Sequence, residues 1–139
     1  MTQTSSTVLI VDDEVEIGWA LERILRKTAC QSFCAHSGKA AVEMAEKTHF
    51  DLVLVDAGLP DQDGLDVILA LRSRYPDLKA ILISGYFFED DVRVRKWVDE
   101  GLIVGFVSKP FSIAHVRETV QRALAPGGPP ASHGMDAPP

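Results

Sequence analysis

Acidic, hydroxyl and ammonium side chains stand at four places in the chain where a short apolar run ends. They are Asp12 and Asp13 after residues 8–11, Asp56 after residues 52–55, Ser84 after residues 80–83, and Lys109 shortly after residues 103–107. Three carboxylates, one hydroxyl and one ammonium are the groups needed to move a phosphoryl group onto a carboxylate and to neutralise its charge. This pattern predicts phosphoryl chemistry, provided that the fold brings the four places together.

Asp56 is the residue on which this chemistry would centre. It ends the run Leu52–Val55, and the chain breakers Gly58, Pro60 and Gly64 follow it closely. A continuous apolar run of this length is typical of a strand buried on both faces of a parallel sheet. The rim beyond such a strand is where ligands collect in open α/β sheets. We therefore predict that Asp56 is a nucleophile that becomes an acyl phosphate.

The other polar groups have roles that follow from their charge. Asp12 and Asp13, together with Asp56, would hold Mg²⁺, which takes oxygen ligands and relieves repulsion among crowded carboxylates. Lys109 would neutralise charge on the phosphoryl oxygens, and the Ser84 hydroxyl would hydrogen-bond one of them. Catalysis at such a site is mostly positioning and electrostatics.

The elements that must position these groups alternate between strand and helix. Apolar runs predict strands at 7–11, 31–35, 52–55, 79–84 and 103–107, and helical periodicity follows each of them. One of these helices is expected over Glu89–Glu100, with Val94, Trp97 and Val98 inward and Gly101 as its C-cap. Five strand–helix units favour an α/β three-layer sandwich around a parallel sheet. Parallel strands end on the same rim, which would unite the four places.

The bulk composition suits one domain. The chain has 139 residues, 46% of them hydrophobic, and a net charge of −6, which argues against direct nucleic-acid binding. No apolar run is long enough to span a membrane, and Met1–Thr7 lacks a signal-peptide pattern, so we expect a cytoplasmic protein. Cys30 and Cys34 are interpreted as structural, and residues 126–139, rich in Pro and Gly, as a disordered tail or linker after a domain at 1–125.

Taken together, the motifs resemble the receiver domain of two-component response regulators from Val8 to about Ala125. The matching pieces are Val11-Asp12-Asp13-Glu14, Asp56 with Pro60 and Asp63-Gly64, Ser84-Gly85, and Lys109-Pro110-Phe111. The resemblance implies a flavodoxin-like fold with strand order 2-1-3-4-5. It also implies that a histidine kinase or histidine phosphotransfer protein phosphorylates Asp56 with Mg²⁺ as cofactor. The domain would not be an enzyme in its own right, beyond self-phosphorylation from a phosphodonor and slow autodephosphorylation.

The resemblance also assigns roles around the metal. Asp13 and Asp56 would ligate it directly, Asp12 would act through water, and the backbone carbonyl of Gly58 would be a further ligand. The bond between Lys109 and Pro110 would be cis.

For switching, the resemblance points to Ser84 and to Phe106, the aromatic residue three positions before Lys109. The ring of Phe106 is expected to move inward when Ser84 moves toward the phosphoryl group. The fourth helix, fifth strand and fifth helix would then form the face that binds a downstream partner, a fused output domain or a second copy of the chain. We further expect Gly58 to leave attacking water unhindered while Tyr86 partly shields the phosphate.

Several alternatives stay open or are disfavoured. A haloacid-dehalogenase-type phosphatase needs a second Asp where this chain has Gly58, and a nucleotide or flavin binder needs a Gly-rich loop where it has Asp12-Asp13-Glu14. A phosphate-independent interaction module and a receiver segment cut from a longer regulator or hybrid kinase remain possible readings. Trp19 and the run Tyr86-Phe87-Phe88 either contact a partner or cover neighbouring elements. His36, His49 and His115 are expected on the surface.

Overall fold

A computed structural model describes residues 6–87 and 90–125 of the chain. Strands and helices alternate throughout. The elements are β1 (Ser6–Val11), α1 (Val15–Arg26), β2 (Cys30–Ala35), α2 (Gly38–Lys47), β3 (Leu52–Asp56), α3 (Gly64–Arg74), β4 (Lys79–Ser84), α4 (Val92–Asp99), β5 (Gly105–Ser108) and α5 (Ile113–Leu124). The predicted alternation is confirmed.

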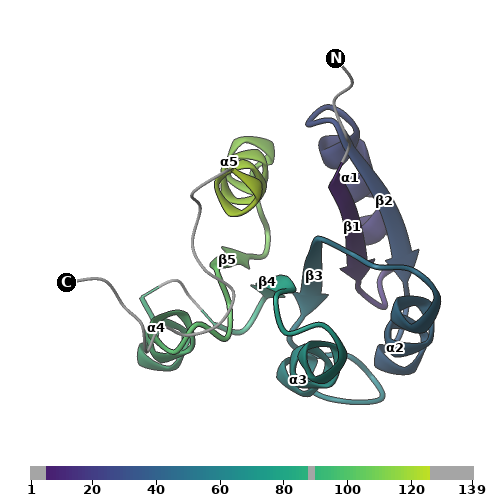
Figure 1. The fold of residues 1–139 in the computed structure, drawn as a ribbon. Helices are drawn as coiled ribbons and strands as arrows, with labels where there is room; N and C mark the ends of the chain where they lie inside the picture. Colours follow the sequence, from purple (N-terminus) through teal and green to yellow (C-terminus); the bar gives the residue numbers. More distant parts are fainter. Residues whose placement is uncertain (1–5, 88–89, 126–139) are drawn as a thin grey trace.

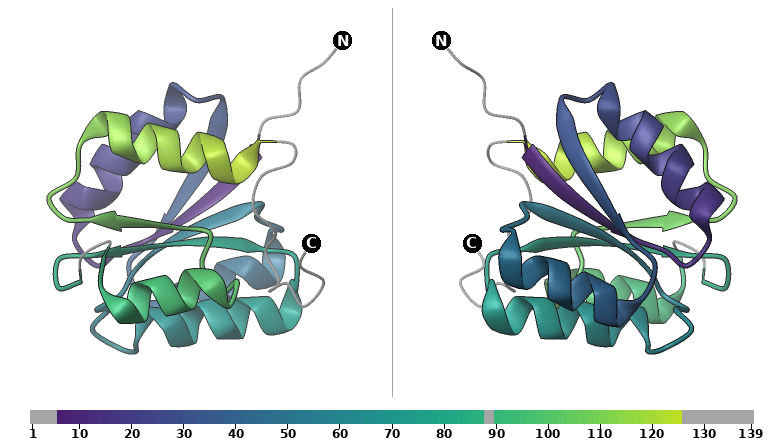
Figure 2. Two further views of the ribbon diagram at one scale, coloured as in Figure 1. Left: turned by 90° about the vertical axis from the view of Figure 1, so that its left-hand side faces the viewer. Right: turned by 90° about the vertical axis from the view of Figure 1, so that its right-hand side faces the viewer.

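The strands form one parallel sheet with the order β2-β1-β3-β4-β5. Helices α1 and α5 cover one face, and α2, α3 and α4 cover the other (Figures 1 and 2). This is the three-layer, flavodoxin-like architecture and the strand order that the motifs implied. The strand that carries Asp56 is the centre of the sheet, with β1 on one side and β4 on the other.

The core explains why the central strands are apolar without a break. All five residues of β3 are buried, and the side chains of its four apolar residues point alternately into two separate hydrophobic clusters. Leu52 and Leu54 face α1 and α5, whereas Val53 and Val55 face α2, α3 and α4. The edge strand β2 is only partly buried, in line with its weaker apolar pattern.

Local signals set the helix ends. The side chains of Ser37, Asp63, Asp91 and Ser112 each accept a backbone N–H in the first turn of α2, α3, α4 and α5. The C-cap of α4 is Glu100, one residue before the predicted Gly101. Gly101 follows it with a positive φ of 76°, the left-handed conformation that often ends a helix just after its cap. Helix α3 ends at Arg74, before Pro76.

Helix α4 differs from its prediction. It begins at Val92 rather than Glu89, and residue 89 lies outside the described residues. Val98 was expected to be buried but is 43% exposed. It borders an open pocket between α4 and β5, so its side chain faces the sheet without being covered.

Two further expectations concern the ends of the chain. Residues 126–139, predicted to be a disordered tail, lie outside the described residues. Within 6–87 and 90–125, no helix has both the length and the apolar character needed to cross a membrane.

Candidate functional site

The carboxyl ends of the strands bring the predicted groups together around the Lys109 ammonium. Its Nζ lies 3.0 Å from Oδ2 of Asp12 and 3.3 Å from Oδ2 of Asp56. Glu14 adds a third carboxylate, with Oε1 3.6 Å from the same nitrogen. These residues follow β1, β3 and β5, so the topology unites them although 53 positions separate Asp56 from Lys109.

The carboxylates form a cluster suited to a cation. One oxygen from each of Asp12, Asp13 and Asp56 lies within 4.8 Å of the other two. Asp12 and Asp56 are only 1% and 8% exposed, while Asp13 opens to solvent. Oδ2 of Asp12 is buried, and its partner among the described residues is the Lys109 ammonium 3.0 Å away. Three crowded carboxylates, two of them buried, fit a hard divalent cation such as Mg²⁺, because a dication relieves their mutual repulsion.

The electrostatics show two opposing effects. Burial raises the pKa of the Asp12 carboxyl above its usual value, although the Glu14 N–H and Lys109 pull it down. Burial also opposes the charge on Lys109, but the neighbouring Asp12 and Asp56 outweigh it and raise the Lys109 pKa. For the pKa of Asp12, the effect of burial, together with the charge of Asp56, is therefore larger than the combined effect of the Glu14 N–H and Lys109. Without a cation, the site holds a buried negative charge that its single ammonium does not fully compensate.

The loop between β3 and α3 is folded tightly against Asp56. The amide of Gly58 donates to Oδ1 of Asp56 at 3.2 Å, and the amide of Gly64 donates to the Ala57 carbonyl at 2.9 Å. Gly58 and Asp63 also form an isolated antiparallel bridge. The backbone of Gly64 approaches so closely that a Cβ there would overlap the carbonyl oxygen of Asp56. Gly64 is therefore a close-approach position.

Ser84 is fully buried at the end of β4, where its Oγ accepts two backbone N–H groups. These come from Tyr86 at 2.9 Å and Phe87 at 3.2 Å. The hydroxyl therefore holds the β4–α4 loop in this conformation, a role that the sequence did not reveal. The end of β5 lies beside it, because the Lys109 amide donates to the Ser84 carbonyl at 2.8 Å. The Lys109–Pro110 bond is cis.

The aromatic run after Ser84 divides between two environments. The ring of Phe87 packs edge-on against Trp97 of α4, with centroids 5.5 Å apart, and the Arg93 guanidinium lies 4.5 Å from its centroid. Tyr86 is 84% exposed and lies beside Gly58, where a Cβ would come within 3.7 Å of its ring. Phe87 thus covers the fourth helix, Tyr86 faces solvent near the site, and Phe88 lies outside the described residues.

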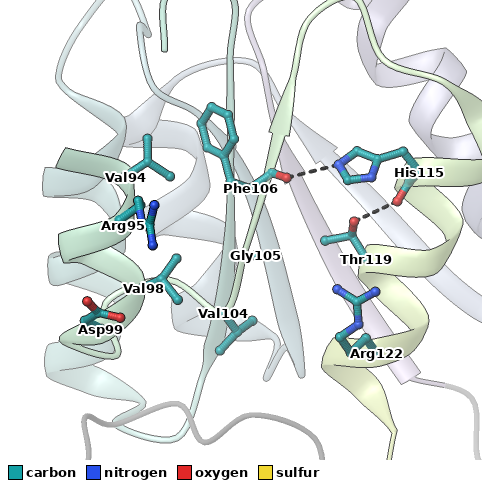
Figure 3. Close-up of a pocket in the computed structure, with 10 residues that line it drawn as sticks. All are labelled: Val94, Arg95, Val98, Asp99, Val104, Gly105, Phe106, His115, Thr119 and Arg122. Carbon is teal, nitrogen blue, oxygen red and sulfur yellow. Dashed lines mark hydrogen bonds between the residues drawn. The ribbon is translucent and has the colours of Figure 1, made fainter. Parts of the chain in front are cut away.

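Phe106 lies on β5 beside a pocket of about 340 Å³ between α4, β5 and α5 (Figure 3). Its ring is buried. His115 of α5 points at this strand, with Nε2 3.3 Å from the Phe106 carbonyl oxygen, and the Thr119 hydroxyl donates to the His115 carbonyl (Figure 3). His115, predicted to be a surface residue, lines this pocket and is half-buried in the contact with Phe106.

Of the remaining sequence candidates, Trp19 is 62% exposed on α1, and Cys30 and Cys34 are free thiols on the edge strand. Sequence reasoning assigned no role to Glu14, His115 or Asp61. Glu14 had a signal, since it continues the acidic run, but the contacts of His115 and Asp61 join segments distant in sequence and left no pattern to find.

Comparison with known proteins agrees with this geometry. Residues 8–121 match the family model described as the response regulator receiver domain. The chain is 30% identical over 117 residues to sporulation initiation phosphotransferase F of Bacillus subtilis, covering 84% of this chain and 92% of that protein. It is 34% identical to the sensor kinase CckA of Brucella abortus over 86% of this chain, but spans only 13% of that kinase. The solved structure of the chemotaxis response regulator CheY4 of Vibrio cholerae superposes with a TM-score of 0.76 at 26% identity, covering 87% of this chain and 100% of that one.

Proposed function

The chain belongs to the response regulator receiver family, and from this premise we propose that Asp56 is the phosphoacceptor of a two-component phosphorelay. The observation that carries the proposal is the carboxylate of Asp56 at the centre of the rim, with the Lys109 ammonium 3.3 Å away and two further carboxylates beside it. A carboxylate so placed is a nucleophile whose product, an acyl phosphate, would be held by a cationic group.

The chemistry follows from the charges. An oxygen of Asp56 attacks phosphorus, the bond from phosphorus to the donor breaks, and the donor leaves with the bonding electron pair. Lys109 moves from pairing with carboxylates to pairing with phosphoryl oxygens, for which its raised pKa keeps it protonated. The Ser84 hydroxyl is the nearby group able to donate a hydrogen bond to a phosphoryl oxygen.

Asp12, Asp13 and Asp56, with the backbone carbonyl of Gly58, would hold the Mg²⁺. When bound, the ion neutralises the phosphoryl oxygens and orients them toward the attacking carboxylate. The crowding of the three carboxylates supports this assignment, because a dication relieves their repulsion. The family resemblance implies that Asp12 would act through water.

We propose a histidine kinase or a histidine phosphotransfer protein as donor. The relatives support this class, since one is named a phosphotransferase and another a sensor kinase. The domain itself would only phosphorylate itself from a phosphodonor and lose the phosphate slowly. Whether it acts alone or as a segment of a longer regulator, its output is a protein partner, a fused domain or a second copy of the chain.

Switching would proceed through Ser84. If its hydroxyl turns toward the phosphoryl group, the amides of Tyr86 and Phe87 lose their acceptor and the β4–α4 loop must rearrange. That loop carries Phe87, which packs on α4, and the buried Phe106 ring would adjust on the neighbouring strand. The face formed by α4, β5 and α5, with the pocket shown in Figure 3, is therefore the proposed readout surface.

Intact-mass spectrometry tests the proposal. The full chain is incubated with acetyl phosphate and Mg²⁺, alongside Asp56→Asn and the matched control Asp66→Asn, which removes an exposed carboxylate on α3. We expect one phosphoryl group on the wild type and on Asp66→Asn, and none on Asp56→Asn or in excess EDTA. Absence of both phosphate uptake and Mg²⁺ binding in folded wild type would instead support a phosphate-independent interaction module.

A further inference from the structure

We propose that Asp61 is a positioning residue whose carboxylate ties the β3–α3 loop to the N-terminus of α2 and thereby holds the metal-binding rim in shape. The inference rests on the proposed function, since it concerns the same carboxylate cluster. Asp61 would contact neither the phosphoryl group nor the cation. It acts through the loop that carries Gly58.

The tie consists of two hydrogen bonds between segments far apart in sequence. The amide of Gly38 donates to Oδ1 of Asp61 at 2.9 Å, and the amide of Lys39 donates to Oδ2 at 3.0 Å. Both oxygens are used, so the carboxylate grips the first turn of α2 with two contacts. The first amides of a helix have no partner within it, and a carboxylate is the acceptor that the helix dipole favours there.

Helix α2 already has a cap of its own. The Ser37 hydroxyl accepts the Ala40 amide at 3.1 Å, which is the usual local arrangement. Asp61 therefore adds to a helix end that is capped without it. A second contact seats the same loop, because the Gln62 side chain lies so close to Gly38 that a Cβ there would come within 2.6 Å of it.

The charge state of Asp61 agrees with this role. Its two hydrogen bonds from Gly38 and Lys39 lower the pKa of the carboxyl below its usual value. The group therefore stays ionised at neutral pH, where both of its oxygens accept hydrogen bonds.

The segment that Asp61 grips also touches the opposite side of the rim. Nδ1 of His36 lies 3.1 Å from the carbonyl oxygen of Asp12, and the Asp12 amide donates to the Ala35 carbonyl at 3.1 Å. Residues 35–39 thus contact Asp12 at one end and Asp61 at the other. They join the loop after β1 to the loop after β3 through the end of β2 and the first turn of α2.

This path has a consequence for the cation. Asp12 and Asp13 would hold it from the loop after β1, and Asp56 would hold it from the end of β3. The Gly58 carbonyl, a proposed ligand, would reach it from the β3–α3 loop. Untying Asp61 would leave the side chains in place but let the Gly58 segment move relative to the others. Groups that orient metal ligands typically change affinity by 10–100-fold when removed. Asp61 is further from the cation, so we expect Mg²⁺ binding to weaken by about three- to tenfold.

If Asp61 only capped α2, its removal should have the same effect on Mg²⁺ binding as removal of the other cap, Ser37. Ser37→Ala removes a cap from the same helix end but leaves the loop tied, whereas Asp61→Ala removes a cap and unties the loop. Calorimetric titration of the full chain with MgCl₂ compares wild type, Ser37→Ala, Asp61→Ala and the more conservative Asp61→Asn. We expect weaker Mg²⁺ binding in both Asp61 variants, the smaller effect in Asp61→Asn, and wild-type binding in Ser37→Ala.

Amide hydrogen exchange without metal gives a second measurement. Exchange at Gly58 should accelerate in the Asp61 variants and not in Ser37→Ala, because only the former free the loop. Wild-type Mg²⁺ affinity in Asp61→Asn, or equal losses in the Ser37 and Asp61 variants, would overturn the inference. Failure of wild type to bind Mg²⁺ at all would instead overturn the proposed function, so the two failures are distinct.

Discussion

Substituting Gly64, the first residue of α3, by Ala should damage the site more than adding a methyl group at Gly58 in the loop before it. A Cβ at Gly64 would overlap the backbone carbonyl oxygen of Asp56, lie 2.9 Å from Cα of Ala57, and lie 3.0 Å from the Asp56 carbonyl carbon. All three atoms belong to the backbone, so no rotamer change relieves the contact. The chain must shift at the residue that is proposed to attack phosphorus.

The expected cost is a balance of two terms. Overpacking against a rigid neighbour typically costs about 1–3 kcal/mol. Gly64 is the first residue of α3, where Ala gains at most about 1 kcal/mol over Gly in helix propensity. The net loss in the free energy of unfolding should therefore be about 1–2 kcal/mol. Because displacements of about 1 Å can slow a positioned reaction by about 100-fold, we expect phosphorylation of Asp56 to slow by about tenfold or more.

Gly58→Ala is the matched control for stability, since it lies in the loop just before α3 and its Cβ would meet only the Tyr86 ring at 3.7 Å, an ordinary contact. Urea denaturation gives the stability, and intact mass against time with acetyl phosphate and Mg²⁺ gives the rate. Gly58→Ala should stay within about 0.5 kcal/mol of wild type. If Gly64→Ala matched the control in both stability and rate, the close approach at Asp56 would not constrain the site and the reasoning would fail.

Four further predictions address the switch, the phosphate lifetime and the electrostatics. Ser84→Ala should still take phosphate on Asp56, but the fluorescence of Trp97, measured in a Trp19→Phe background, should no longer change on phosphorylation. A fluorescence response like that of wild type would show that Ser84 does not control the β4–α4 loop. Trp97→Leu removes the aromatic contact with Phe87, which is worth about 0.5–1.5 kcal/mol. If that contact stabilises the unphosphorylated loop, the variant should bind beryllium fluoride, used in place of the phosphoryl group, about two- to tenfold tighter than wild type. Equal binding would refute this. Tyr86→Ala should shorten the phosphate lifetime and Gly58→Asn lengthen it, as followed by decay of the phosphorylated mass; no change in either contradicts the shielding argument. Asp12→Asn should raise the free energy of unfolding in EDTA at neutral pH, because the raised pKa of Asp12 means that ionising its carboxyl in the folded protein costs stability. This gain should vanish as the pH falls through the folded-state pKa toward the unfolded-state pKa, below which Asp12 is protonated in both states. A gain that persists in acid would point to another cause.

Much of the fold was predictable because its signals are local. The unbroken apolar run of β3 follows from burial on both faces, and the breakers after Asp56 mark the loop. Once five parallel strands are inferred, their polar ends must share a rim. The meeting of Asp12, Asp56 and Lys109 therefore follows from topology alone.

What the sequence did not reveal depends on contacts across the fold. Val98 has the spacing of a buried residue, yet it is 43% exposed because no residue within 6–87 and 90–125 fills the pocket between α4 and β5. His115 is held by the carbonyl of Phe106, and a backbone acceptor leaves no trace in sequence. Asp61 looks like an ordinary loop residue beside Pro60, and only the position of α2 gives its carboxylate two partners.

In the structure, the Ser84 hydroxyl already accepts hydrogen bonds from the amides of Tyr86 and Phe87, so switching must break both of them. Moving it to a phosphoryl oxygen gives up two hydrogen bonds, each worth about 0.5–1.5 kcal/mol net. A hydrogen bond to a charged acceptor returns about 1.5–3 kcal/mol. These amounts nearly cancel, so Ser84 alone does not decide the equilibrium. The equilibrium between the two loop conformations then depends mainly on contacts that change with the loop, chiefly the packing of Phe87 on Trp97 and Arg93. Phosphorylation at the rim and partner binding on α4 would then act on the same equilibrium, which requires that a partner favouring the rearranged loop also favours phosphorylation.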